Sequence, residues 1–232
     1  MKYKGTIIGE ASGSLASMVF SHNRGGQYIR QRSIPTNPNS EYQQIIRGLV
    51  SQLTSAWQSV LTEAQRLAWD TYAELVPLLD PLGGTRNVGG LGMYIRSNVA
   101  RLQAADADLA RIDAAPTEFN LGDFTPPGIT SITATTKVAI ITFEEADAWV
   151  SEDGAAMLIY GSRGQNASRN FFKGPYRYAG KIEGDSGSPL TSPQNITLPF
   201  ALAAGQKAFI RCVVTRADGR MSSTFRAGKV CI

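Results

Sequence analysis

The stretch KAFIRCVVTRADGRMSSTFRAGKV, residues 207–230, indicates the architecture of the C-terminal half of the chain. Two runs rich in Val, Ile, Thr and Phe, residues 207–215 and 222–231, flank Ala217-Asp-Gly219. Asp-Gly between β-prone runs is a hairpin signal. Upstream lie five more β-prone runs separated by turn residues: 129–134, 138–144, 156–161, 177–182 and 195–200. About seven short strands in such a segment predict an immunoglobulin-like β-sandwich.

The same hairpin makes a prediction about the two cysteines. A turn centred on Asp218 and Gly219 places Cys212 opposite Phe225, with Cys231 ~20 Å further along the strand at ~3.3 Å per residue. A disulfide needs Cα atoms within ~7 Å, so we expect free thiols. With two cysteines and a single histidine, His22, the sequence predicts no metal site and no cofactor.

In residues 40–115 the apolar residues recur at the spacing of a helix. Two segments, Ser40-Glu-Tyr-Gln43 and Thr62-Glu-Ala-Gln65, fit the capping box that opens a helix. Apolar residues follow each at helical spacing, and we expect Trp57 and Trp69 to fill a small helical core. The glycines of Leu82-Gly-Gly84 and of residues 89–92 predict a loop, with a third helix from about Met93 to Leu102.

Residues 1–39 predict an extended basic arm. Residues 1–40 contain five basic side chains and one acidic one. Two β-prone runs, residues 17–21 and 27–32, flank a Gly-rich turn, and Pro35 and Pro38 favour an extended exit. Too few apolar residues are present for a separate core, so we expect the arm to order on a partner. The candidate partner-binding residues are Arg24, Tyr28, Arg30 and Arg32.

The predicted fold class is therefore α+β in three segments. Residues 1–39 form the β-hairpin arm, residues 40–115 a small helical segment, and residues 116–232 an immunoglobulin-like β-sandwich. The longest apolar runs are far shorter than the ~18 residues of a membrane span, so no membrane partner is expected. The first residues lack the apolar region of a secretory signal, and we expect synthesis in a cytoplasm.

The motif GDSGSP, residues 184–189, differs by one residue from the nucleophile motif of chymotrypsin-like serine proteases. A nucleophilic Ser186 would need a general base, and His22 lies in the arm without the surrounding residues of that family. Gly, Asp, Ser and Pro are also ordinary turn residues. We therefore predict a loop and a protein that is not an enzyme. Glu144, Glu145 and Asp147 could hold a cation but are interpreted as a solvated strand end.

Two resemblances can be named. Residues 125–132 and 209–223 look like the first and last strands of a fibronectin type III-like domain. Residues 21–40, with Leu61-Thr-Glu-Ala-Gln-Arg-Leu-Ala-Trp69, resemble virion proteins of tailed bacteriophages and prophages over roughly the first 100 residues. The second resemblance implies a structural protein of the virion, made in the cytoplasm of a bacterial host.

We expect a capsid cement or decoration protein that is anchored by its arm to other virion proteins, major capsid or neck and tail subunits, and that forms a homo-oligomer. A neck or tail (head–tail connector) component is an alternative. Two further alternatives are a nucleic-acid-binding module using the arm and a glycan-binding module using the sandwich. Nucleic acid is the less expected partner, because only Tyr28 lies among the arginines of the arm. Glycan binding would use aromatic residues expected in loops and edges: Trp149, Phe171, Phe172, Tyr176 and Tyr178.

Overall fold

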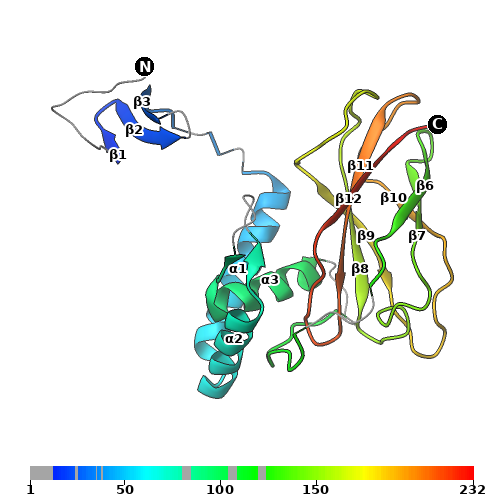
Figure 1. The fold of residues 1–232 in the computed structure, drawn as a ribbon, viewed down its shortest axis with the longest axis horizontal. Coiled ribbons are helices and arrows are strands. Elements are labelled where there is room, and N and C mark those ends of the chain that lie inside the picture. The colour runs from blue at the N-terminus through cyan, green and yellow to red at the C-terminus, as the bar shows by residue number, and fades with distance from the viewer. Residues whose placement is uncertain are drawn as a thin grey trace. The chain divides into compact units, whose positions relative to one another are not determined.

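The computed structural model describes residues 13–23, 26–34, 36–37, 39–79, 85–103, 109–119 and 124–232. The chain divides into two compact units, Met1–Glu41 and Tyr42–Ile232. The described elements are mixed helix and antiparallel sheet, which confirms the α+β class (Figure 1).

The first unit carries a three-stranded antiparallel sheet in the order β1-β2-β3. Its strands are β1 (Gly13–Leu15), β2 (Met18–Asn23) and β3 (Gly26–Gln31). The predicted hairpin is confirmed, because β2 pairs with β3 from Met18 opposite Gln31 to Asn23 opposite Gly26. Strand β1 was not expected from the sequence, which has little β-prone character there.

The second unit begins with three helices: α1 (Glu41–Ser59), α2 (Glu63–Leu75) and α3 (Gly89–Gln103). A two-stranded ribbon, β4 (Leu78–Leu79) and β5 (Thr85–Arg86), lies between α2 and α3 in the chain. The capping box at α2 is confirmed, with Gln65 N–H donating to Thr62 Oγ1 at 3.3 Å. As expected, the tryptophans enter the helical core: Trp69 is fully buried, and Trp57 packs against that core.

Of the predicted loop, residues 82–84 lie outside the described residues. The prediction for residues 89–92 is wrong, because these glycines form the first turn of α3. Gly89 adopts φ +72°, and its N–H donates to Asn87 Oδ1 at 2.8 Å. A Cβ on Gly90 would come within 2.6 Å of Asp70 N, so glycine is needed where α3 crosses α2. Close helix packing, and not a flexible connection, accounts for the glycines.

The remaining strands form two antiparallel sheets, of three strands in the order β10-β7-β6 and four in the order β12-β11-β8-β9. Both sheets contribute to one apolar core, through residues such as Ile141, Ile159 and Ile210. All seven predicted strands are confirmed with small shifts at their ends: β6 (Gly128–Thr133), β7 (Val138–Thr142), β8 (Ala156–Gly161), β9 (Arg177–Glu183), β10 (Gln194–Thr197), β11 (Lys207–Thr215) and β12 (Phe225–Val230).

The hairpin register predicted for residues 207–230 is confirmed. Strand β11 pairs with β12 from Lys207 opposite Val230 to Cys212 opposite Phe225. Cys212 and Cys231 are both buried free thiols. Burial raises the pKa of the Cys212 thiol to about 12.

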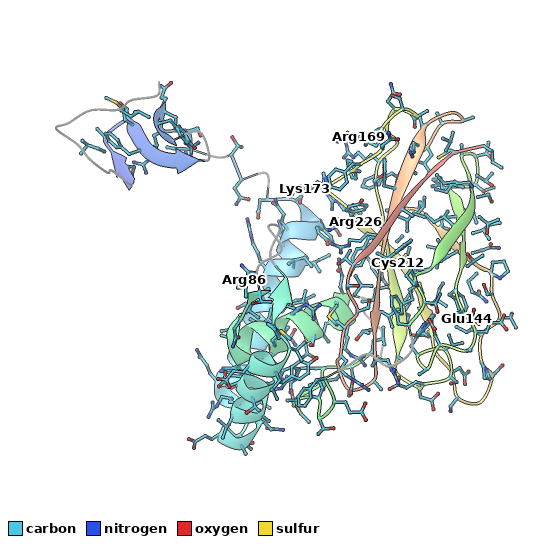
Figure 2. The ribbon with its side chains drawn as sticks, viewed as in Figure 1. Arg86, Glu144, Arg169, Lys173, Cys212 and Arg226 are labelled. Carbon is cyan, nitrogen blue, oxygen red and sulfur yellow. The ribbon has the colours of Figure 1, made fainter. Side chains whose placement is uncertain are left out.

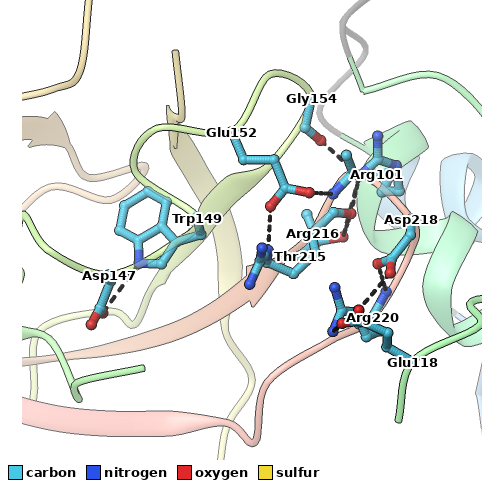
Figure 3. Close-up of polar contacts among 11 residues, drawn as sticks. Arg101, Glu118, Asp147, Trp149, Glu152, Gly154, Thr215, Arg216, Asp218 and Arg220 are labelled. Carbon is cyan, nitrogen blue, oxygen red and sulfur yellow. Dashed lines mark hydrogen bonds and ion pairs between the residues drawn. The ribbon is translucent and has the colours of Figure 1, made fainter. Parts of the chain in front are cut away.

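One arginine joins the helices to the sheets. Arg101, in the last turn of α3, is 3% exposed and donates to the carbonyl oxygens of Ala110, Gly154 and Arg216 at 3.2, 3.0 and 2.9 Å (Figure 3). Further along the chain, Arg220 pairs with Glu118 at 2.7 Å and with Asp218 at 2.6 Å. These polar contacts bind α3 and the segment before β6 to the end of the four-stranded sheet.

Candidate partner-binding arm

The arm sheet has two chemically different faces. Residues opposed across an antiparallel pair share a face, and neighbours along a strand alternate. Phe20 is opposite Ile29, and Met18 is opposite both Leu15 and Gln31, so these residues share one face. Val19 is opposite Arg30 and Ser21 is opposite Tyr28, and all four residues lie on the other face. We call the first the apolar arm face (Leu15, Met18, Phe20 and Ile29).

The apolar arm face is partly uncovered. Leu15 is 70% exposed and Met18 51% exposed, while Phe20 and Ile29 are half-buried. Exposing two large apolar side chains on one small sheet is costly in water, at ~25 cal/mol per Å² of apolar surface. The arrangement is therefore suited to packing against another protein surface.

Three of the four predicted partner-binding residues can be placed. Tyr28 and Arg30 lie on β3, on the face opposite the apolar arm face. Arg32 follows β3, and its N–H donates to Ser17 O at 2.7 Å. Arg30 and Arg32 are exposed and form no ion pair within the part of the arm that the structure describes. Arg24, Pro35 and Pro38 lie outside the described residues.

The GDSGSP motif lies in the loop between β9 and β10, as predicted. Ser186 donates from its backbone N–H and from Oγ to the two carboxylate oxygens of Asp153, each at 2.8 Å. Both hydrogen bonds lower the pKa of the Asp153 carboxyl, and the one from the Ser186 backbone N–H has the larger effect. Asp185 Oδ1 accepts from Gly187 N–H at 2.8 Å and Ser188 N–H at 3.1 Å. Ser186 is thus part of a hydrogen-bonded turn.

The aromatic set expected to bind glycans is not a surface platform. Trp149 is 1% exposed and packs against Phe143 in the shared core of the two sheets, with ring centroids 5.3 Å apart. Phe172 and Tyr176 are also buried, and only Phe171 is strongly exposed, at 67%. All five do lie in loops or, for Tyr178, on the edge strand β9, as expected. Three of them are buried there, so they present no continuous surface for a sugar.

The acidic cluster after β7 is likewise not one solvated strand end. Asp147 is buried, and its carboxylate accepts from Thr125 N–H at 2.9 Å and from Trp149 Nε1 at 3.3 Å. Glu145 Oε1 accepts from Ser192 N–H at 2.7 Å, and Glu144 is exposed. Among the described residues no group of three metal-ligating side chains lies close enough to hold an ion. Asp147 is a structural acceptor that orients the buried tryptophan.

A cationic loop escaped the sequence analysis. The connection between β8 and β9 carries Arg163, Arg169 and Lys173, and residues 156–181 contain five basic side chains and no acidic one. Arg169 lies 5.0 Å over the ring of Phe172, and Arg163 lies 5.3 Å over that of Phe200. The absence of acidic residues from this stretch could have predicted a cationic loop from the sequence. The stacking of Arg163 and Arg169 on phenylalanine rings could not be predicted, because it depends on the fold.

Comparison with known proteins adds no family to this description. No protein-family model matches the chain, and no curated protein is significantly similar to it. In the described part of the chain, no helix has both the length and the apolar character needed to cross a membrane.

Proposed function

We propose that the chain is a non-enzymatic structural protein of a tailed-phage virion, a capsid cement or decoration protein anchored by its N-terminal arm. The observation that carries the proposal is the arm itself. It is a separate compact unit whose sheet leaves Leu15 70% and Met18 51% exposed. The resemblance of roughly the first 100 residues to tailed-phage virion proteins supports the particle as its place of action.

We propose further that the two C-terminal sheets form an immunoglobulin-like sandwich of the fibronectin type III kind. Seven antiparallel strands in two sheets with a shared core support this assignment. The first, second and fifth strands make one sheet, and the third, sixth and seventh lie together in the other. The fourth strand, β9, pairs with β8 in the second sheet, which departs from the constant-type immunoglobulin order.

The two faces of the arm have different parts in this attachment. The apolar arm face packs on the neighbouring virion protein, where burying Leu15 and Met18 contributes about 1.5–3 kcal/mol each. Arg30 and Arg32 meet carboxylates of that protein, because a planar guanidinium pairs with them in two hydrogen bonds. Pairs at the rim of the contact add little, so the apolar arm face supplies most of the affinity.

The test deletes residues 2–39 and scores incorporation into particles together with binding of purified protein to duplex DNA. Loss of incorporation with unchanged DNA binding is the expected result. The double variant Leu15→Ser/Met18→Ser should reproduce that loss in the full chain, whereas Leu67→Ser, at a 66% exposed position on α2, should not.

Normal incorporation of the truncated protein would refute the anchoring role of the arm. A fall in DNA affinity on deletion, with incorporation retained, would favour the nucleic-acid alternative. A density map of the purified particle then locates the chain on the capsid, the neck or the tail.

A further inference from the structure

The loop between β8 and β9 presents one exposed aromatic side chain on a firm support. Phe171 is 67% exposed, while its neighbour Phe172 is buried against Phe209 and Tyr176, with ring centroids 5.7 and 5.3 Å apart. Arg169 Nε donates to Phe171 O at 2.9 Å. The backbone at Phe171 is thus held by Arg169 on one side and by the buried Phe172 on the other, while its side chain is exposed.

Two cations lie two residues from Phe171 in the chain, and the guanidinium of one, Arg169, stacks on the ring of Phe172 and donates to Gln165 Oε1 at 2.7 Å. Arg169 and Lys173 are exposed, and neither forms an ion pair in the described part of the chain. Figure 2 shows both at one end of the sheets and Glu144 toward the other end. We call Arg169, Phe171 and Lys173 the cationic knob.

A groove with the complementary character lies in the same unit. It has a volume of about 770 Å³ and lies between the edge strands β9 and β10 and the loops before β8 and after β9. Such a volume is typical of ligand pockets, which measure roughly 300–1,000 Å³. Its apolar lining residues are Leu109, Ala155, Ile182, Leu190 and Ile196, of which only Leu190 is not buried, and Gln194 and Asn195 line it as well.

The rim of the groove is acidic. Asp153, Glu183 and Asp185 line it, with Lys181 as the one basic lining residue, paired to Glu183. The hydrogen bonds from Ser186 hold the Asp153 carboxylate in place and lower its pKa, and Asp185 is fixed by the turn at residues 187–188. Both aspartates are exposed, so their charges face solvent.

The knob and the groove cannot meet within one copy. The loop of the knob joins the end of β8 at Gly161 to the start of β9 at Arg177. Asp153 precedes the start of β8, and Asp185 follows the end of β9. The two features therefore lie at opposite ends of the same strands, ~20 Å apart for six residues at ~3.3 Å each.

We propose that the partner of the groove is a second copy of this chain, whose Phe171 enters it while Arg169 and Lys173 face Asp153 and Asp185. The observation that carries the proposal is charge complementarity: the exposed Phe171 lies in the chain between two cations without an ion pair among the described residues, and the groove, lined by apolar and polar residues, has an acidic rim. The contact is heterologous, so a pair of copies still has one free groove and one free knob, and association continues into rings or open chains. No residue of the arm takes part, so this inference is separate from the anchoring role.

The experiment measures association of the purified full-length chain by sedimentation velocity across a concentration series. Concentration-dependent species larger than a dimer are expected at low salt. Phe171→Ala should weaken association at least tenfold, and Arg169→Glu/Lys173→Glu should abolish it. Leu67→Ala, at a 66% exposed apolar position away from both surfaces, is the matched control and should leave association unchanged.

Reversing the charges of the groove and of the knob in separate variants tests whether the knob of one copy binds the groove of another. Asp153→Lys/Asp185→Lys should not associate alone but should associate when mixed with Arg169→Glu/Lys173→Glu. Because Asp153 also holds Ser186, the first variant could disturb its loop. A photo-reactive phenylalanine analogue at position 171 of the otherwise unchanged chain therefore gives a second readout. Cross-links should map to residues 153–155 and 182–196 of another copy.

Several outcomes would overturn the proposal. A chain that stays monomeric at every concentration, or cross-links that map elsewhere on the partner copy, would exclude the contact. Duplex DNA binding that falls with Phe171→Ala, without self-association, would make the knob a nucleic-acid surface instead. Because particle incorporation is not measured here, failure of this experiment leaves the test of the arm untouched.

Discussion

Gly184, the first residue of GDSGSP, is required because two backbone segments approach it closely. A Cβ at this position would come within 2.6 Å of Glu152 O and would also collide with Trp149 O. Both oxygens belong to the loop before β8, so the glycine lets the loop after β9 pack against it. The resemblance to a protease motif therefore has a packing explanation in this fold.

We predict that Gly184→Ala lowers the free energy of unfolding by about 1–3 kcal/mol, the usual cost of overpacking. Urea denaturation followed by tryptophan fluorescence measures this change. Gly187→Ala is the matched control, since the only neighbour of its added Cβ would be Asp185 Oδ1 at 3.4 Å. Equal stability of the two variants would show that the loops move apart freely.

A second prediction at this scale concerns Cys212. Burial raises the pKa of its thiol to about 12 in the folded chain, against ~8.5 in an unfolded one. The folded state thus holds the proton more tightly, and the contribution to stability is full below pH ~8.5 and lost as pH rises toward 12.

Unfolding free energy should therefore fall between pH 8 and pH 10.5, and less so in Cys212→Ala. Urea titrations at the two pH values test this. Rapid reaction of Cys212 with a thiol reagent in the native protein at pH 8 would contradict the burial on which the prediction rests.

At the scale of the element, α2 begins with a complete capping box. Thr62 N–H donates to Gln65 Oε1 at 2.9 Å, and Gln65 N–H donates to Thr62 Oγ1 at 3.3 Å. Both bonds satisfy backbone donors that the first turn of a helix leaves without partners. Local sequence is enough to place this helix start, because the interacting residues are three positions apart.

We predict that Thr62→Ala destabilises the protein by about 1 kcal/mol through loss of the cap. Thr62→Ser keeps the hydroxyl and should cost much less. Thermal unfolding monitored by circular dichroism at 222 nm compares the three proteins. An unchanged midpoint for Thr62→Ala would mean that tertiary packing alone holds this helix end.

At the scale of the whole molecule, the unit Tyr42–Ile232 joins helices and sheets through buried polar contacts. Arg101 of α3 reaches the carbonyl oxygens of Gly154 and Arg216, which flank strands β8 and β11 (Figure 3). Asn98 exchanges hydrogen bonds with Ile112, at 2.7 and 3.0 Å, and fixes the segment that leads toward the sheets. We therefore expect the helices and the sheets to unfold together.

Arg101→Met should cost about 3 kcal/mol, because several buried carbonyl oxygens lose their donor. It should also separate the unfolding of the helices from that of the sheets. Calorimetry would then show two transitions in place of one. Arg66→Met is the control, because this side chain bonds only Trp57 O and Gln58 O inside the helical part and should cost less than about 1 kcal/mol.

The sequence alone determined the α+β class, the seven C-terminal strands and the register of β11 with β12. These features depend on alternation, capping and turn residues, which act between near neighbours. Only the tertiary structure decided that Trp149 is buried, that Gly90 opens a helix, and that Phe171 is exposed between two cations. The reason is that burial and close approach depend on residues distant in the chain, such as Asp70 facing Gly90, which no local pattern encodes.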